Sequence, residues 1–156
     1  MPLHPNALER LRLQPSGITA LLDGKDEAVL SAHPVPDKWS ALENLAHLTR
    51  YHQVFLGRLE QILVTPNQPF PRYKAELDPE WPQWQAMNSR EVLDQFRRLR
   101  AQMQERLQGL REAQLSSTGL HPAFGVLDVP TMLEMFLVHE GHHLYVMFQR
   151  IHEQRR

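Results

Sequence analysis

Hydrophobic residues recur along most of the chain at the spacing of about 3.6 residues that one face of an α-helix requires. Three segments show this pattern and begin with a polar start signal: Ser40 to about Leu63, Asn88 to Leu110, and Thr131 to about Gln154. In each segment a glutamate follows the first residue by three positions, which forms a capping box for the free N–H groups of the first turn. The pattern therefore predicts three long helices.

A fourth helical segment runs from Asn6 through Leu22 and contains a proline. Pro15 either opens a short helix that ends at Asp23-Gly24 or kinks a longer one. The connection from Thr65 to Pro82 is long, and its aromatic residues favour packing over disorder. No alternating strand pattern is present. Four such helices predict an all-α fold, a four-helix bundle with a long loop between the second and third helices.

The composition is that of one ordinary globular domain spanning residues 1–156, with 42% hydrophobic and 22% charged side chains. A net charge of −1 argues against a large nucleic-acid interface. The densest basic cluster, formed by Arg97, Arg98 and Arg100, is interpreted as a solvated helix face. No segment approaches the ~20 apolar residues of a membrane span, and no secretory signal is recognised, so a cytoplasmic location is expected.

The histidines carry the chemistry, because the chain has nine of them and no cysteine. His139 and His143 lie four residues apart on the last predicted helix, so they share one face within an apolar stripe. Two buried imidazoles without partners would each be destabilising by ~1 to 3 kcal/mol, and a shared metal ion would supply both partners. On the second helix, periodicity favours His52, at the centre of the stripe. His47 lies toward its edge, where it can still face a neighbouring helix.

The run Trp39-Ser40-x-x-Glu43-Asn44-Leu45-Ala46-His47-Leu48, followed later by His139-Glu140-x-x-His143-Leu144, resembles the DinB-like (DinB/YfiT) superfamily. Members of this superfamily are metal-binding four-helix bundles. The resemblance implies one metal ligand at His47 and two more at His139 and His143, which together hold one divalent ion, zinc or nickel. It covers most of the chain.

Three side chains near the predicted ligands are assigned no definite role in the metal site. His52 falls where some relatives of the superfamily carry histidine. His142 lies three residues after His139 and could replace His143 as a ligand, although helical phase places it toward the edge of the stripe. Glu140 could accept a proton or a hydrogen bond near the site, but its phase turns it away from both ligands.

Three neutral imidazoles with one open position are typical of a catalytic metal, because structural zinc normally has a fourth protein ligand. The resemblance implies a metal-dependent enzyme, foremost a transferase that uses a low-molecular-weight thiol such as bacillithiol or mycothiol. The alternatives are a metal-dependent hydrolase and a metal-binding stress or interaction protein without turnover. The expected partner is a small-molecule substrate, neither nucleic acid nor membrane, and a homodimer is left open.

A catalytic interpretation requires a cleft beside the metal with groups that orient a substrate. The candidates are aromatic or cationic residues of the second helix and the long loop: Tyr51, Arg58, Tyr73, Trp81 and Trp84. Packing or surface solvation explains each of them equally well.

Overall fold

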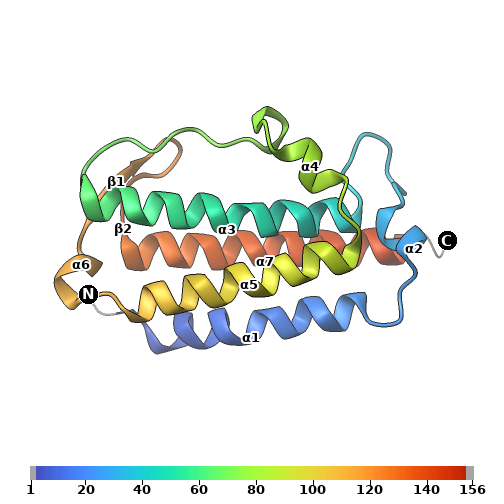
Figure 1. Ribbon diagram of the computed structural model, residues 1–156, viewed down its shortest axis with the longest axis horizontal. Helices are drawn as coiled ribbons and strands as arrows, with labels where there is room; N and C mark the ends of the chain where they lie inside the picture. The colour runs from blue at the N-terminus through green and yellow to red at the C-terminus, as the bar shows by residue number, and fades with distance from the viewer. Residues whose placement is uncertain (1–2, 154–156) are drawn as a thin grey trace.

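A computed structural model describes residues 3–153 and confirms the predicted four-helix bundle (Figure 1). The long helices are α1 (Pro5–Leu22), α3 (Ala41–Val64), α5 (Ser89–Gln108) and α7 (Val129–Glu153). Helix α3 packs against α5 and α7, and α1 packs against the same two helices. Helices α1 and α3 therefore lie diagonally opposite each other across the core.

The long loop follows from the directions in which the helices run (Figure 1). Helices α1 and α7 run one way along the bundle, and α3 and α5 run the other way, so the chain must return along the bundle between α3 and α5. This crossover contains a 3₁₀ turn, η1 (Ala75–Leu77), and a short helix, α4 (Trp81–Gln85). Three aromatic side chains of the crossover are buried in the fold: Phe70, Trp81 and Trp84. The loop is thus packed, as its composition predicts.

Shorter elements fill the other two connections. A short helix, α2 (Glu27–Ser31), links α1 to α3, and α6 (Glu112–Leu115) follows α5. The strands β1 (Thr118–His121) and β2 (Gly125–Asp128) then form an antiparallel hairpin before α7. Sequence analysis predicts no strand here, because four residues are too few for an alternating pattern to be recognised.

Two of the three predicted capping boxes are present. The Ser40 hydroxyl accepts a hydrogen bond from the Glu43 N–H at 3.0 Å, and the Glu43 carboxylate accepts one from the Ser40 N–H at 2.8 Å. Asn88 and Glu91 form the same reciprocal pair, at 3.0 and 2.9 Å. These caps set the starts of α3 and α5 where the sequence predicts them.

The predicted start of α7 is wrong. The helix begins at Val129, and the Thr131 N–H donates to the Asp128 carboxylate at 2.9 Å. Glu134, the expected partner of Thr131, instead accepts from Arg10 of α1 at 2.6 Å. Asp128 is an equally good N-cap residue and precedes Thr131, so its carboxylate accepts from an N–H of the first turn. The predicted end at Gln154 lies outside the described residues.

Helix α1 is continuous, and its proline leaves one carbonyl oxygen available to the core. Pro15 lies inside α1 and has no N–H, so the Leu11 carbonyl lacks its usual helical partner. Arg100 of α5 donates Nη1–H to that carbonyl at 3.0 Å. The longer of the two predicted forms of this helix is therefore correct.

Arg100 contacts the three other long helices, so its assignment to a solvated face is wrong. Its Nε donates to His52 of α3 at 3.0 Å, and its Nη2 donates to the Glu140 carboxylate of α7. Arg100 is 3% exposed and Glu140 is fully buried, whereas Arg97 and Arg98 are exposed as predicted. Burial raises the pKa of Glu140 above its ordinary value, and the charge of Arg100 opposes that rise.

Replacing Arg100 by methionine should lower the free energy of unfolding by about 3 to 5 kcal/mol, because Glu140 becomes an uncompensated buried charge. Urea unfolding followed by circular dichroism measures this. The matched control is Arg106→Met, because Arg106 pairs with Glu60 at 2.6 Å on a solvent-accessible surface. In this control the free energy of unfolding should fall by less than about 1 kcal/mol. Equal losses in the two variants would contradict a central role for Arg100.

Candidate metal centre

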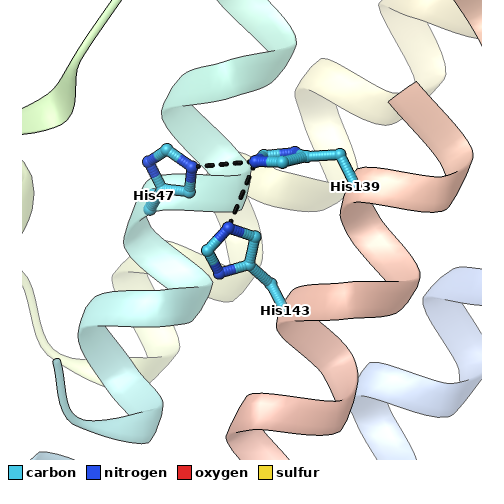
Figure 2. Close-up of side chains that lie close together, drawn as sticks. All are labelled: His47, His139 and His143. Atoms are coloured by element: carbon cyan, nitrogen blue, oxygen red, sulfur yellow. Dashed lines mark hydrogen bonds between the residues drawn. The ribbon is translucent and has the colours of Figure 1, made fainter. Parts of the chain in front are cut away.

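Three histidines from two helices meet between α3 and α7 (Figure 2). His47 comes from α3, and His139 and His143 come from adjacent turns of α7. The Nε2 atom of His139 lies 3.2 Å from Nε2 of His47 and 3.1 Å from Nε2 of His143. The nitrogen atoms facing this point all lie within 4.8 Å of one another. The structure therefore brings together the three residues that the family resemblance selects.

His52, which helical phase alone favours, does not join this cluster. Its Nδ1 donates to the Leu48 carbonyl at 2.8 Å, and its Nε2 accepts from Arg100 at 3.0 Å. Burial lowers the pKa of His52 to about 3, so the ring is neutral. Both ring nitrogens are thus used, and His52 is a hydrogen-bonded core histidine. The most apolar face of α3 points at the bundle core, whereas its edge, with His47, faces α7.

His142 lies beside the cluster without joining it. Its ring centroid is 5.2 Å from that of His143, and the side chain is exposed. Glu140 turns away from the cluster, as helical phase predicts, and bonds Arg100 in the core. Neither residue is part of the three-histidine cluster.

The three clustered imidazoles are neutral near physiological pH. Burial, followed by the charge of a neighbouring imidazole, lowers the pKa of His47, His139 and His143 to about 3. A metal ion binds only the neutral form of histidine, since the cation has no free lone pair. The buried cluster therefore holds its side chains in the form that metal binding requires.

Asn44 orients His143. Its amide nitrogen donates to the Ser40 carbonyl at 2.7 Å and to the Trp39 carbonyl at 3.4 Å. The amide oxygen therefore faces His143 Nδ1, at 2.7 Å. Because that oxygen can only accept, Nδ1 carries the proton and Nε2 directs its lone pair at the other two histidines. Sequence analysis assigns Asn44 no role, and the available signal is an asparagine three residues before His47 on an apolar helix.

The hydrogen bonding within the cluster is incomplete without a further partner. Because Nδ1 of His143 carries the proton, its Nε2 offers only a lone pair. A proton on Nε2 of His139 could form a hydrogen bond with His143 or with His47, but not with both, so one of these contacts would stay unpaired. The Nδ1 atoms of His47 and His139 are also buried with no partner among residues 3–153. One cation that accepts three lone pairs removes the conflict at the Nε2 atoms. The donor set fits zinc, nickel or a similar ion, which imidazole binds well.

Aromatic rings cover the cluster on the side of the crossover. The ring centroid of Trp39 is 4.9 Å from that of His47, and Tyr73 stacks on the same imidazole at 6.0 Å. The ring of Tyr51 is 4.4 Å from that of His139. These rings limit access of water to the three imidazoles from this side.

A cavity of about 1010 Å³ opens onto the cluster. All three clustered histidines contribute to its wall, together with His142 and residues of the crossover, the hairpin and α7, and the lining is mostly apolar. Three of the five residues proposed to orient a substrate line the cavity: Tyr51, Arg58 and Tyr73. Trp81 and Trp84 pack in the core instead.

The fold and the cluster define a class of protein, the four-helix bundle with a three-histidine cluster. The chain belongs to the DinB superfamily, whose family model matches residues 10–147. YfiT from Bacillus subtilis, described as a probable metal-dependent hydrolase with an unusual four-helix bundle topology, matches with a TM-score of 0.81 at 15% identity, over 93% of this chain and 83% of YfiT. TT2238, described as a four-helix bundle protein, matches with a TM-score of 0.66 at 27% identity, over 91% and 95% of the two chains. No curated protein matches the chain.

Alanine variants at five histidines should separate ligands from neighbours. Replacing His47, His139 or His143 should weaken zinc or nickel binding by several orders of magnitude, because two protein ligands remain. The same change at His52 or His142 should leave the affinity nearly unchanged. Competition with a chelator measures affinity, and circular dichroism checks that each variant stays helical. If His52→Ala abolishes binding while His47→Ala does not, the ligand on α3 is misassigned.

Replacing Asn44 by alanine should weaken metal binding by about 10- to 100-fold, because His143 loses the acceptor that fixes its tautomer. Asn44→Asp keeps an acceptor for His143 but turns its second oxygen toward the Ser40 and Trp39 carbonyls in place of a donor, so an intermediate loss of affinity is expected. Chelator competition compares the two variants with the unmodified protein. Full affinity in Asn44→Ala would show that the hydrogen bond to His143 does not orient a ligand.

Proposed function

We propose that the protein is a metal-dependent enzyme whose divalent ion is held by His47, His139 and His143. The observation that supports this proposal is that three neutral imidazoles converge on one point and an apolar cavity of about 1010 Å³ opens onto it. Three protein ligands leave a coordination position for a small nucleophile. A divalent ion there lowers the pKa of a water or thiol, so that a nucleophile forms near neutral pH.

The residues around the cavity supply the remaining functions. Trp39, Tyr51 and Tyr73 exclude water from one side of the cluster and offer flat apolar surfaces to a substrate. His142 lines the cavity next to His143, where it can accept a proton from the nucleophile. The lining favours a small molecule with a substantial apolar part.

Thiol transfer is the reaction we favour. The three-histidine group includes no carboxylate, and Glu140, which follows His139, is used by Arg100. Of the two carboxylates in the cavity wall, Glu134 pairs with Arg10 and Glu76 is exposed. A thiol has an ordinary pKa of about 8.5, far below that of water, so it loses its proton without a carboxylate base. The chain has no cysteine, so the thiol must be a cosubstrate, such as bacillithiol or mycothiol. Its sulfur would form a bond to an electrophilic carbon as the leaving group departs.

A metal-dependent hydrolase is the second candidate. Its support is the similarity to YfiT, which is described as a probable metal-dependent hydrolase. The same cluster can activate water in place of a thiol. A metal-binding stress or interaction protein without turnover is less well supported, because such a protein has no need of an apolar cavity beside the ion.

The partner we propose is a small molecule, in agreement with the balanced charge of the chain. None of the helices within residues 3–153 combines the length and apolar character that crossing a bilayer requires. A cytoplasmic location stays a proposal.

Purified protein should carry about one divalent ion per chain, and product should form from an electrophile such as 1-chloro-2,4-dinitrobenzene only when a thiol is added. Removing the metal with a chelator should abolish the reaction, and returning zinc or nickel should restore it. His139→Ala is the control for the site, and Arg106→Met is the control for general effects of substitution. Turnover without any thiol would favour the hydrolase, and inert protein with full metal would favour the non-catalytic alternative.

A further inference from the structure

Arg58 of α3 lies in the wall of the cavity with its charge unmatched. Arg58 is 5% exposed and contributes to the cavity lining. Nη1 donates to the Tyr51 hydroxyl at 3.1 Å, and Nη2 donates to the Pro71 carbonyl at 3.3 Å. Both acceptors are neutral. The Nε atom is buried and has no hydrogen-bond partner in the described part of the chain.

The absence of a counterion distinguishes Arg58 from the other buried arginine. Arg100 is buried to a similar degree and pairs with Glu140. Two carboxylates line the cavity: Glu134 pairs with Arg10 at 2.6 Å, and Glu76 is exposed. No ion pair within residues 3–153 involves Arg58. Burying a charge without a counterion is strongly unfavourable. An anion in the cavity would remove that penalty.

Arg58 lies close enough to the histidine cluster for one small molecule to contact both. The hydroxyl of Tyr51 accepts from Arg58, and the ring of the same tyrosine is 4.4 Å from the ring of His139. The guanidinium also packs 5.2 Å from the ring centroid of Phe70. An anionic group bound by Arg58 would therefore place the rest of the molecule along Tyr51, toward the three imidazoles.

We propose that Arg58 binds a carboxylate on the substrate, which makes the substrate class a carboxylic acid with an apolar body. A guanidinium has five N–H donors, of which two are used here, so donors remain for a carboxylate without loss of the present contacts. The single charge and planar fork of one guanidinium match a carboxylate monoanion in charge and geometry. Arg72 and Lys74 also line the cavity but are exposed and solvated. This inference rests on the proposed function, because it assigns the substrate of the same site.

The test compares 4-phenylbutyrate with its neutral amide, 4-phenylbutyramide, by calorimetry on zinc-loaded and metal-free full-length protein. The unmodified protein should prefer the carboxylate by about 10-fold or more, as expected for a hydrogen-bonded charged group. Arg58→Gln should reduce this preference to about 1, and the matched control Arg72→Gln should keep it. The preference should be present without zinc, because Arg58 acts independently of the ion. Binding is measured without turnover, so a failed thiol assay leaves the result intact.

Two further measurements keep the inference testable if Arg58→Gln does not fold. Arg58→Lys keeps the charge without the two-pronged geometry, so a reduced but measurable preference is expected. In the unmodified protein, the NMR signal of the Arg58 Nε–H should shift with the carboxylate and not with the amide. The inference is overturned if the preference survives in folded Arg58→Gln, appears only with zinc, or is lost equally in Arg72→Gln. Tighter binding of phenyl phosphate, or no binding of the carboxylate, also overturns it.

Discussion

The buried contact between Arg100 and Glu140 is the interaction on which the arrangement of the bundle depends. Arg100 extends from α5 and bonds a carboxylate of α7, an imidazole of α3 and a carbonyl of α1. The carbonyl belongs to Leu11 and is available because Pro15 has no N–H to donate to it. With Glu140 fixed toward the core, the rotation of α7 about its axis is also fixed. His139, one residue earlier, therefore faces α3 and the cavity instead of the core.

The direction of the helices then completes the site. Because α3 and α5 run the same way, the chain crosses back along the bundle, and this crossover brings Tyr73 onto the imidazole of His47. The start of α3 supplies Asn44, whose amide is held by two carbonyls near the capping box. The same helix start that the capping residues define thus orients His143 on a different helix.

Periodicity and caps predict the four helices, because these signals lie within a single segment. The start of α7 is missed because Asp128 and Thr131 carry equally good local signals, and only the folded chain shows which one is used. Periodicity also cannot choose correctly between His47 and His52, because the choice depends on which helix each side chain faces in the folded chain. The family resemblance selects His47. The partners of His52 include Arg100, a side chain that the local pattern assigns to solvent. A buried arginine is recognisable only when the groups that neutralise it, contributed by other helices, are in view.

Completeness of hydrogen bonding separates the polar residues that support the fold from those available to a ligand. His52 uses both ring nitrogens in the core. The unpaired buried nitrogens belong instead to residues of the cavity wall: Nδ1 of His47, Nε of Arg58 and Nδ1 of His139. Three side-chain oxygens are also unpaired: the hydroxyl of Tyr73 in the cavity wall, and one oxygen each of Gln14 and Glu140 outside the cavity. Folded proteins seldom leave buried polar groups unpaired without a reason, and a ligand is one such reason. The cavity wall offers two kinds of binding: the Nε2 lone pairs of the three imidazoles suit a cation, and the guanidinium of Arg58 suits an anion. That combination fits a metal and a carboxylate substrate bound side by side.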